Sequence, residues 1–273
     1  MRLLERLNTP TAVLVVLFAA VAANAYLYFA YYLPATSSAS ASRPGPEATY
    51  PDLEKKSKSF SPRPTLPVRT GDPLLVGAGD IASCASSGDE ATAKLIDRMP
   101  NATVFTLGDN VYEDGTAFEF ADCYDPSWGR FKAHTNPAVG NHEYQTPGAS
   151  GYYNYFGSAG GDPKKGYYSY DLGAWHLISL NSMCGEVGGC GATSPMGSWL
   201  KKDLRSHPAR CTLAYFHHPL FSSGSEHGND PRMRPIWDVL YAADAEVVLN
   251  GHDHDYERFA PRRRSGSRTP RRG

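Results

Sequence analysis

Five short apolar runs, each followed directly by acidic, amide or imidazole side chains, constrain the fold of this chain more than any other feature. The runs are LLVGAG, VFTLG, PAVG, TLAYF and EVVLNG, and they begin at residues 74, 104, 137, 212 and 246. The polar residues that follow them include Asp80, Asp109, Asn141, His142, His217, His252 and His254. Core packing does not require polar side chains at these positions. Short apolar runs bounded by turn residues predict buried strands, and α/β sheets bind ligands beyond the carboxyl ends of their strands.

Helical patterns lie between the predicted strands. We expect helices over residues 89–99, 194–206 and 231–243, and the second begins with a serine N-cap and a proline at the first helical position. Residues 167–181 predict a hairpin that turns at Leu172-Gly173. Strands that alternate with helices predict an α/β domain built from βαβ units, and the hairpin adds antiparallel strands.

The N-terminal part of the chain differs in composition from the rest. Residues 11–33 form an apolar run broken only by Asn24, which is long enough to span a bilayer as a helix. We expect residues 1–35 to be a signal anchor with a transmembrane helix, or else a signal peptide cleaved near Ala23-Asn24-Ala25. Both alternatives place the remainder outside the cytoplasm, either on the cell surface or secreted. Residues 36–70 are rich in proline, serine and alanine and predict a disordered linker.

The charge distribution argues against binding to nucleic acid. The formal net charge is −1, but six arginines lie in the last twelve residues. Without these arginines the chain has 21 basic and 28 acidic residues, so the body is mildly acidic. We therefore expect a globular domain over residues 71–261 and an arginine-rich disordered tail over residues 262–273.

Five cysteines are consistent with an exported protein, because disulfides persist in oxidising compartments. Cys84 and Cys123 each lie in a loop after a predicted strand-end motif, and we expect them to pair. Cys184 could pair with Cys190 or with Cys211, and the sequence leaves both alternatives open. The chain contains no CxxC motif, which argues against a thiolate zinc site.

Five motifs in this order resemble those of a known enzyme superfamily. GDIA (79–82), GDNVY (108–112), GNHE (140–143), AYFH (214–217) and GHDH (251–254) resemble the motifs of the calcineurin-like metallophosphoesterases, and YER (256–258) is similar to their purple acid phosphatase branch. The resemblance covers about residues 74–260. It implies a four-layer αββα sandwich of mixed sheets flanked by helices. The implied activity is hydrolysis of phosphate monoesters by a water that a metal pair activates.

The resemblance also implies a set of metal ligands. Many superfamily members have a ligating histidine where this chain has Ala82, and in the purple acid phosphatase pattern a tyrosine, here Tyr112, replaces it. A phenolate is a hard anionic donor that suits Fe³⁺. The expected cofactors are Fe³⁺ and a divalent ion, which could be Zn²⁺, Mn²⁺ or Fe²⁺. The implied ligands are Asp80, Asp109, Tyr112 and His254 for the first ion, and Asp109, Asn141, His217 and His252 for the second.

Other residues receive roles by the same resemblance. His142 would act as a general acid or bind the phosphate, and His227 is similar to a further histidine of the substrate loop. His218 would orient its neighbour or only form local hydrogen bonds. We expect Glu143 and Asp253 to accept hydrogen bonds from ligating histidines. His134, His176 and His207 lie outside the motifs, and we interpret them as structural or surface residues.

Two alternative functions remain open from the sequence. The same site could hydrolyse phosphodiesters or nucleotides, because loops rather than motifs select the substrate. The chain ends 19 residues after His254, so we also expect that the C-terminal part of the fold could be incomplete. The protein would then be a catalytically impaired metal-binding surface protein.

Overall fold

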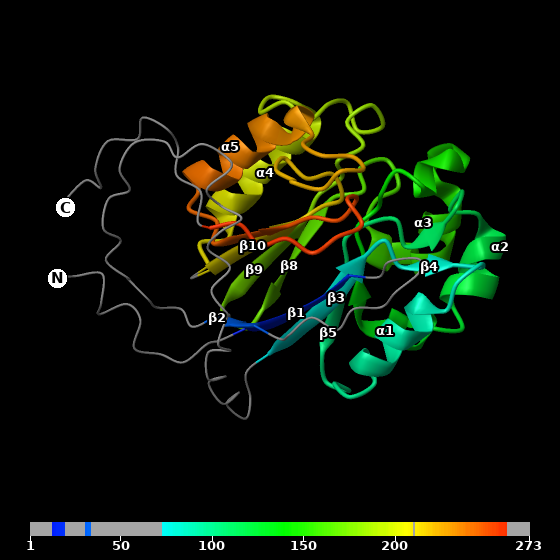
Figure 1. Ribbon diagram of the computed structural model, residues 1–273. Coiled ribbons are helices and arrows are strands. Elements are labelled where there is room, and N and C mark those ends of the chain that lie inside the picture. The colour runs from blue at the N-terminus through cyan, green and yellow to red at the C-terminus, as the bar shows by residue number, and fades with distance from the viewer. Residues whose placement is uncertain (1–12, 20–30, 34–72, 210, 261–273) are drawn as a thin grey trace, which may run out of the picture.

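The predicted strands form two β-sheets that pack against each other in the computed structural model, which describes residues 13–19, 31–33, 73–209 and 211–260 (Figure 1). The first sheet has the order β2-β1-β3-β5-β7. Its strands are β1 (Val13–Ala19), β2 (Tyr31–Leu33), β3 (Leu74–Gly79), β5 (Thr103–Thr106) and β7 (Thr135–Asn136). All neighbours pair in parallel except β1 and β2. The carboxyl ends of β3, β5 and β7 therefore point to the same edge.

The second sheet has the order β11-β10-β9-β8. Its strands are β8 (Tyr168–Leu172), β9 (Trp175–Ser179), β10 (Cys211–Tyr215) and β11 (Val247–Leu249). The predicted hairpin is β8–β9, and Gly173 in its turn has φ 61°, a conformation that glycine adopts easily. β9, β10 and β11 are parallel, so they also end at one edge.

Helices cover the outer face of each sheet (Figure 1). α1 (Gly88–Ile96), α2 (Ala117–Glu119) and α3 (Ser150–Phe156) lie on the side of the first sheet, together with a π-turn, Phe120–Tyr124, and a 3₁₀ segment, Trp128–His134. α4 (Pro195–Ser206) and α5 (Arg234–Ala242) cover the second sheet. As predicted, Ser194 caps α4, and its hydroxyl oxygen accepts a hydrogen bond from Gly197 N at 3.1 Å.

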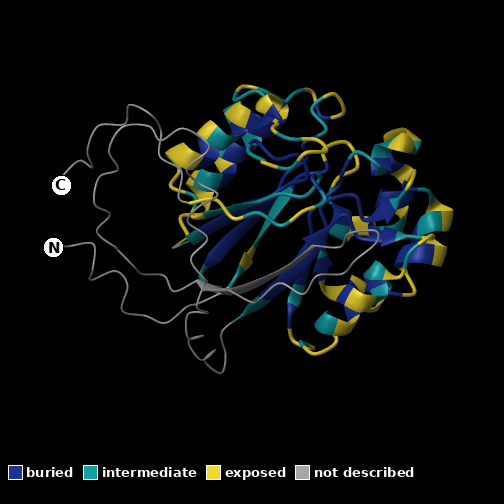
Figure 2. Ribbon diagram, viewed as in Figure 1, coloured by how far each residue is buried: buried dark blue, intermediate teal, exposed yellow. Residues whose placement is uncertain are grey.

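Three apolar clusters hold these layers together (Figure 2). One fills the space between the two sheets and includes Leu75, Phe105, Leu177 and Tyr215, all fully buried. The other two lie between each sheet and its helices. This arrangement confirms the predicted four-layer αββα sandwich.

Within the apolar run over residues 11–33, the described residues 13–19 and 31–33 form strands where we predicted a helix. Val13–Ala19 is a strand that pairs in parallel with β3, and Tyr31–Leu33 is a strand that pairs with it in antiparallel fashion. An apolar run rich in valine suits a buried strand as well as a helix, and hydrophobicity alone cannot separate the two. Among the described residues, no helix has the length and apolar character needed to cross a membrane. The rest of the predicted anchor or signal peptide, the linker over 36–70 and the tail over 262–273 lie outside the described residues.

Disulfides tie two of the loops. Cys84 pairs with Cys123, as predicted, and Cys184 pairs with Cys190, which decides between the two alternatives. Smaller differences concern element ends. The strand expected at residues 137–139 lies at Thr135–Asn136, and the third predicted helix begins with a 3₁₀ turn at Pro231–Met233.

We expect Phe105→Ala to lower the free energy of unfolding by about 3–5 kcal/mol, because it opens a cavity between the sheets. Phe105 is fully buried, and its ring lies 5.4 Å from that of Tyr215 in the other sheet. Urea unfolding monitored by circular dichroism measures the change. Phe118 is 66% exposed, so the control Phe118→Ala should change stability by less than about 0.5 kcal/mol. Equal losses in the two variants would contradict the inter-sheet position of Phe105.

Candidate metal centre

The carboxyl ends of both sheets meet and bring the predicted ligands together. Asp80 follows β3, and Asp109 and Asn141 lie beyond β5 and β7, while His217 follows β10 and His252 and His254 follow β11. Backbone hydrogen bonds connect these loops, from Asp80 N to Gly108 O at 3.1 Å and from Gly251 N to His217 O at 3.0 Å. The residues are far apart in sequence, and the parallel sheets alone place them at one edge.

Three of the side chains form one group. The Tyr112 hydroxyl lies 3.0 Å from Asp80 Oδ1 and 2.9 Å from His254 Nε2. His254 Nε2 is 3.5 Å from Asp80 Oδ1. A short strand, β6 (Val111–Tyr112), delivers the tyrosine, and it pairs with β4 (Ala82–Ser83).

Four side chains form the adjoining group. His217 Nε2 is 3.1 Å from Asp109 Oδ2, 3.0 Å from Asn141 Oδ1 and 3.0 Å from His252 Nδ1. The other nitrogen of His217 bonds the carbonyl oxygen of Leu107 at 2.9 Å, which fixes the ring. Ligand atoms of Asp80, Asp109 and His217 all lie within 4.8 Å of one another, so the two groups are continuous.

The backbone at the centre is constrained. Asp80, Asp109 and His252 have φ values of 56°, 46° and 79°, which are uncommon for residues other than glycine. A Cβ atom at Gly140 would lie 2.1 Å from Asp109 Oδ1, so the approach of this loop to the carboxylate requires glycine. The strand-end geometry therefore brings backbone and ligands unusually close.

The electrostatics of these groups favour bound cations. Burial raises the pKa of Asp109, but the neighbouring His217 and His142 outweigh this effect and lower it to about 2. Burial and the carboxylates of Asp80 and Asp109 raise the pKa of the Tyr112 phenol far above its usual value. A tyrosinate here therefore requires a strongly charged cation. The donor set of carboxylates, phenol, amide and imidazoles, without a thiolate, fits Fe³⁺ and a divalent ion.

The two predicted catalytic histidines lie beside the centre. His142 Nε2 is 3.8 Å from Asp109 Oδ2, and its backbone N–H donates to Asp109 Oδ1 at 2.9 Å. The side chain of His142 is 28% exposed, so it can reach a bound molecule. His227 is exposed, and its ring stacks on that of His252 with 4.1 Å between centroids.

Comparison with known proteins decides the family. The model of the calcineurin-like phosphoesterases matches residues 74–256, which is more than half of the chain and contains every residue of both groups. The chain belongs to this family.

Curated relatives of this calcineurin-like phosphoesterase confirm the predicted branch. Purple acid phosphatase 15 of Arabidopsis thaliana is 26% identical over 216 residues, which cover 66% of this chain and 40% of the relative. Purple acid phosphatase 23 of the same plant is 31% identical over 160 residues, or 50% of this chain and 34% of the relative. The match thus spans less than half the length of these relatives.

A solved structure shares the fold. The purple acid phosphatase PPD1 isolated from yellow lupin (Lupinus luteus) seeds superimposes with a TM-score of 0.50 at 17% sequence identity. The match covers 65% of this chain and 37% of the lupin chain. At this identity the likeness concerns the fold, and it supports the layered sandwich described above.

The structure corrects the role that we predicted for Glu143. This fully buried carboxylate does not contact a ligating histidine. It accepts backbone hydrogen bonds from Asp109 at 3.1 Å, Asn110 at 2.6 Å and Gly140 at 2.7 Å. Burial and the nearby Asp109 raise the pKa of Glu143 to about 7, although the N–H donors favour its ionised form. Its position within GNHE indicated importance, but the sequence could not show that its partners are backbone groups.

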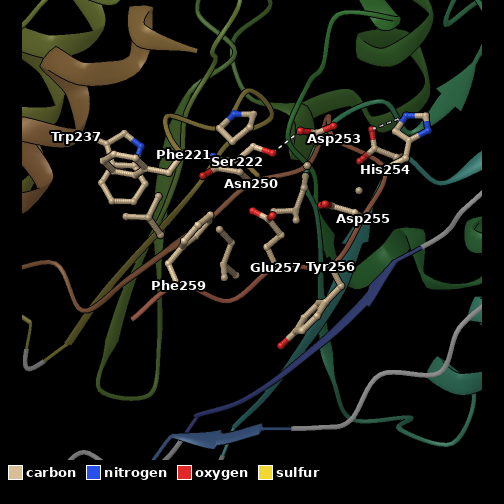
Figure 3. Close-up of a pocket in the computed structure, with 17 residues that line it drawn as sticks. Phe221, Ser222, Trp237, Asn250, Asp253, His254, Asp255, Tyr256, Glu257 and Phe259 are labelled. Atoms are coloured by element: carbon tan, nitrogen blue, oxygen red, sulfur yellow. Dashed lines mark hydrogen bonds and ion pairs between the residues drawn. The ribbon is translucent and has the colours of Figure 1, made fainter. Parts of the chain in front are cut away.

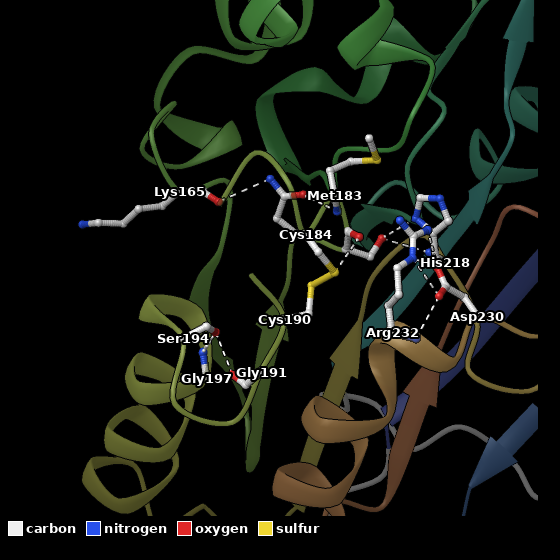
Figure 4. The surroundings of a disulfide bond; sticks show 12 residues. Lys165, Met183, Cys184, Cys190, Gly191, Ser194, Gly197, His218, Asp230 and Arg232 are labelled. Atoms are coloured by element: carbon white, nitrogen blue, oxygen red, sulfur yellow. Dashed lines mark hydrogen bonds and ion pairs between the residues drawn. A yellow bond between two sulfur atoms is a disulfide. The ribbon is translucent and has the colours of Figure 1, made fainter. Parts of the chain in front are cut away.

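Asp253 differs from its predicted role, whereas His218 forms a hydrogen bond to a nearby side chain, which is one of the two roles that we predicted for it. Asp253 accepts hydrogen bonds from Ser222 Oγ and from the backbone of His227 and Gly228, so it orders the loop that carries His227 and does not support a ligand ring. His218 bonds Ser182 Oγ through Nδ1 at 2.8 Å, beside the Cys184–Cys190 disulfide (Figure 4). The Ser182 contribution was not predicted, because no motif contains it.

A cavity of about 150 Å³ adjoins the centre, and Asp80 and His254 are among the residues that line it. His254 lies on the side away from Trp237 (Figure 3). Phe221, Trp237 and Phe259 form its apolar wall. Asp253, Asp255 and Glu257 also line this cavity, so it combines an aromatic wall with carboxylates beside the centre.

We expect Glu143→Gln to lower the free energy of unfolding by about 1–3 kcal/mol, because the new NH₂ group must face backbone N–H donors. The same change should weaken metal binding, since it releases the backbone of Asp109. Denaturant unfolding and metal titration measure the two effects. Glu113 is exposed, and Glu113→Gln serves as the control. If both variants behave alike, Glu143 does not organise these loops.

Proposed function

We propose that this chain is a binuclear-metal phosphatase that hydrolyses phosphate monoesters. Family membership, the purple acid phosphatase relatives and the convergence of seven donor side chains support this proposal. Asp80, Asp109, Tyr112 and His254 would hold Fe³⁺, and Asp109, Asn141, His217 and His252 would hold Zn²⁺, Mn²⁺ or Fe²⁺. Asp109 would contact both ions, as its two oxygens allow.

The observation that carries the proposal is the position of Tyr112. Ala82 has no donor atom, and β4–β6 pairing places Ser83 opposite Tyr112, one residue beyond Ala82. The phenol then reaches Asp80 and His254 at 3.0 Å and 2.9 Å. A tyrosine among carboxylate and imidazole donors favours a trivalent ion, because a hard cation best stabilises the phenolate.

The chain's own residues would orient the ester and supply a proton. When bound, the metal pair would supply an activated water and stabilise charge on the phosphoryl oxygens. Asn141 Oδ1 and Asp109 Oδ2 lie 3.0 Å and 3.1 Å from His217 Nε2, and the three residues would hold the divalent ion. His142 Nδ1 bonds the carbonyl oxygen of Glu113, which directs Nε2 towards Asp109. From there the Nε2 proton could pass to the leaving oxygen, and His227 would bind the phosphate from the opposite loop.

We expect the iron-loaded protein to absorb visible light through a phenolate-to-iron transition, and Tyr112→Phe to lose this band. The control is Tyr144→Phe, whose hydroxyl bonds Asn181 Nδ2 at 2.8 Å and takes no part in either donor group. Metal content measured on the same samples ensures that both variants retain iron. An unchanged band in iron-loaded Tyr112→Phe would refute the tyrosinate assignment.

Turnover of p-nitrophenyl phosphate should exceed that of bis-p-nitrophenyl phosphate if the substrate is a monoester. The comparison uses kcat/KM for both compounds with the metal-loaded full chain. A preference for the diester would favour the phosphodiesterase or nucleotide hydrolase alternative. Bound metals without turnover of either compound would identify a catalytically impaired metal-binding protein.

The two disulfides support a location outside the cytoplasm, because reducing compartments do not maintain such bonds. A mildly oxidising exterior would also keep iron in the trivalent state that Tyr112 favours. We therefore propose an extracytoplasmic phosphatase.

A further inference from the structure

A second group of metal-binding side chains lies at the opposite end of the second sheet from the candidate centre. His176 is the second residue of β9, whereas the centre lies beyond the carboxyl ends of the neighbouring strands (Figure 1). Asp203 lies in the last turn of α4, and His207 directly follows that helix. His176 and His207 belong to no motif, so from the sequence alone we interpreted them as structural or surface residues.

The three side chains converge at short distances. His176 Nε2 is 2.8 Å from Asp203 Oδ2, and His207 Nδ1 is 3.3 Å from Asp203 Oδ1. The two imidazole rings stack with 4.6 Å between centroids. One ligand atom from each residue lies within 4.8 Å of the others. Neighbouring donors around a tetrahedral zinc ion are about 3.3 Å apart, so His176 and Asp203 are close to a suitable separation. An ion lies in the plane of each imidazole that binds it, so the exposed His207 ring must rotate out of the stack and release the carbonyl oxygen of Asp203, which its Nδ1 contacts at 3.0 Å.

A fourth residue, Asp171, orients the His176 ring. Asp171 Oδ1 lies 2.7 Å from His176 Nδ1, on the side of the ring away from Asp203. A carboxylate that accepts the second ring N–H of a histidine orients the ring and increases its basicity, as is common for zinc-bound histidines. Nε2 is then the nitrogen left to bind a cation.

The charges of this group suit a divalent cation. His176 is 1% exposed and lies between two carboxylates, and His207 Nδ1 lies 3.3 Å from one of them. A divalent ion bound by neutral imidazoles balances both carboxylates.

We propose that His176, Asp203 and His207 bind one Zn²⁺ ion, with Asp171 orienting His176. His207 is 45% exposed, so water can reach the ion and occupy a fourth position. Ser169 Oγ donates to Asp203 Oδ1 at 2.9 Å and orients the carboxylate. The ion would join the end of α4 to the β8–β9 hairpin, independently of the binuclear centre.

The test counts zinc in the full chain after equilibrium dialysis against buffered Zn²⁺. His207→Ala should bind one equivalent less than the control His134→Ala, in which another exposed histidine outside both sites is removed. The difference between variants does not depend on how many ions the binuclear centre holds. Equal zinc content in the two variants would overturn the proposal.

Asp171→Asn provides a second variant, since the side chain of Asp171 is 64% exposed and its replacement should not prevent folding. We expect zinc affinity at this site to fall by about 10–100-fold, because the carboxylate that orients His176 is lost. Competition with a chromophoric zinc chelator measures the affinity. An unchanged affinity would show that Asp171 does not orient His176 for the ion, and would overturn that part of the proposal.

Discussion

A single buried carboxylate, that of Glu143, joins two of the loops that carry the predicted ligands of the candidate metal centre. It accepts backbone N–H groups from the loop after β5 and from the loop after β7, and so holds two ligand-bearing segments at a fixed separation. These donors belong to Asp109 and Asn110 on one side and Gly140 on the other. Buried backbone N–H groups need partners, and here one side chain satisfies several of them. Asp109 can adopt its left-handed conformation because this network holds its backbone.

The sequence predicted the fold and the ligand groups for one physical reason. Parallel strands that end at a common edge bring distant residues together, so polar residues after apolar runs reveal a site without any alignment. Asp80 and His254 are more than 170 residues apart, yet their side chains lie 3.5 Å from each other. The resemblance to the purple acid phosphatase pattern implied Tyr112 as a ligand in place of the histidine that Ala82 replaces. The resemblance to a known family then supplied the arrangement of layers.

Other features could not be predicted because they depend on contacts that leave no local pattern. Residues 13–19 are apolar enough for a helix or a strand, and pairing with β3 determines the outcome. The pairing of Cys184 depended on a loop path, and the partners of Glu143 and Asp253 are backbone groups. His176 and Asp203 meet only because α4 packs on β9, and neither residue belongs to a recognisable motif.

The division of the donors between the sheets has a mechanical consequence. The first sheet carries Asp80, Asp109 and Asn141, whereas the second carries His217, His252 and His254, so ions bound at the proposed centre would link the two sheets. Separation of the two sheets would break the bonds between the ions and their ligands, so bound ions would oppose this separation. A ligand that binds only the native state, at a free concentration of 100 times its Kd, raises the free energy of unfolding by about 2.7 kcal/mol. The stability of this protein would therefore depend on the concentration of free metal ions. At low metal concentration the protein would thus lose folding stability as well as catalytic activity.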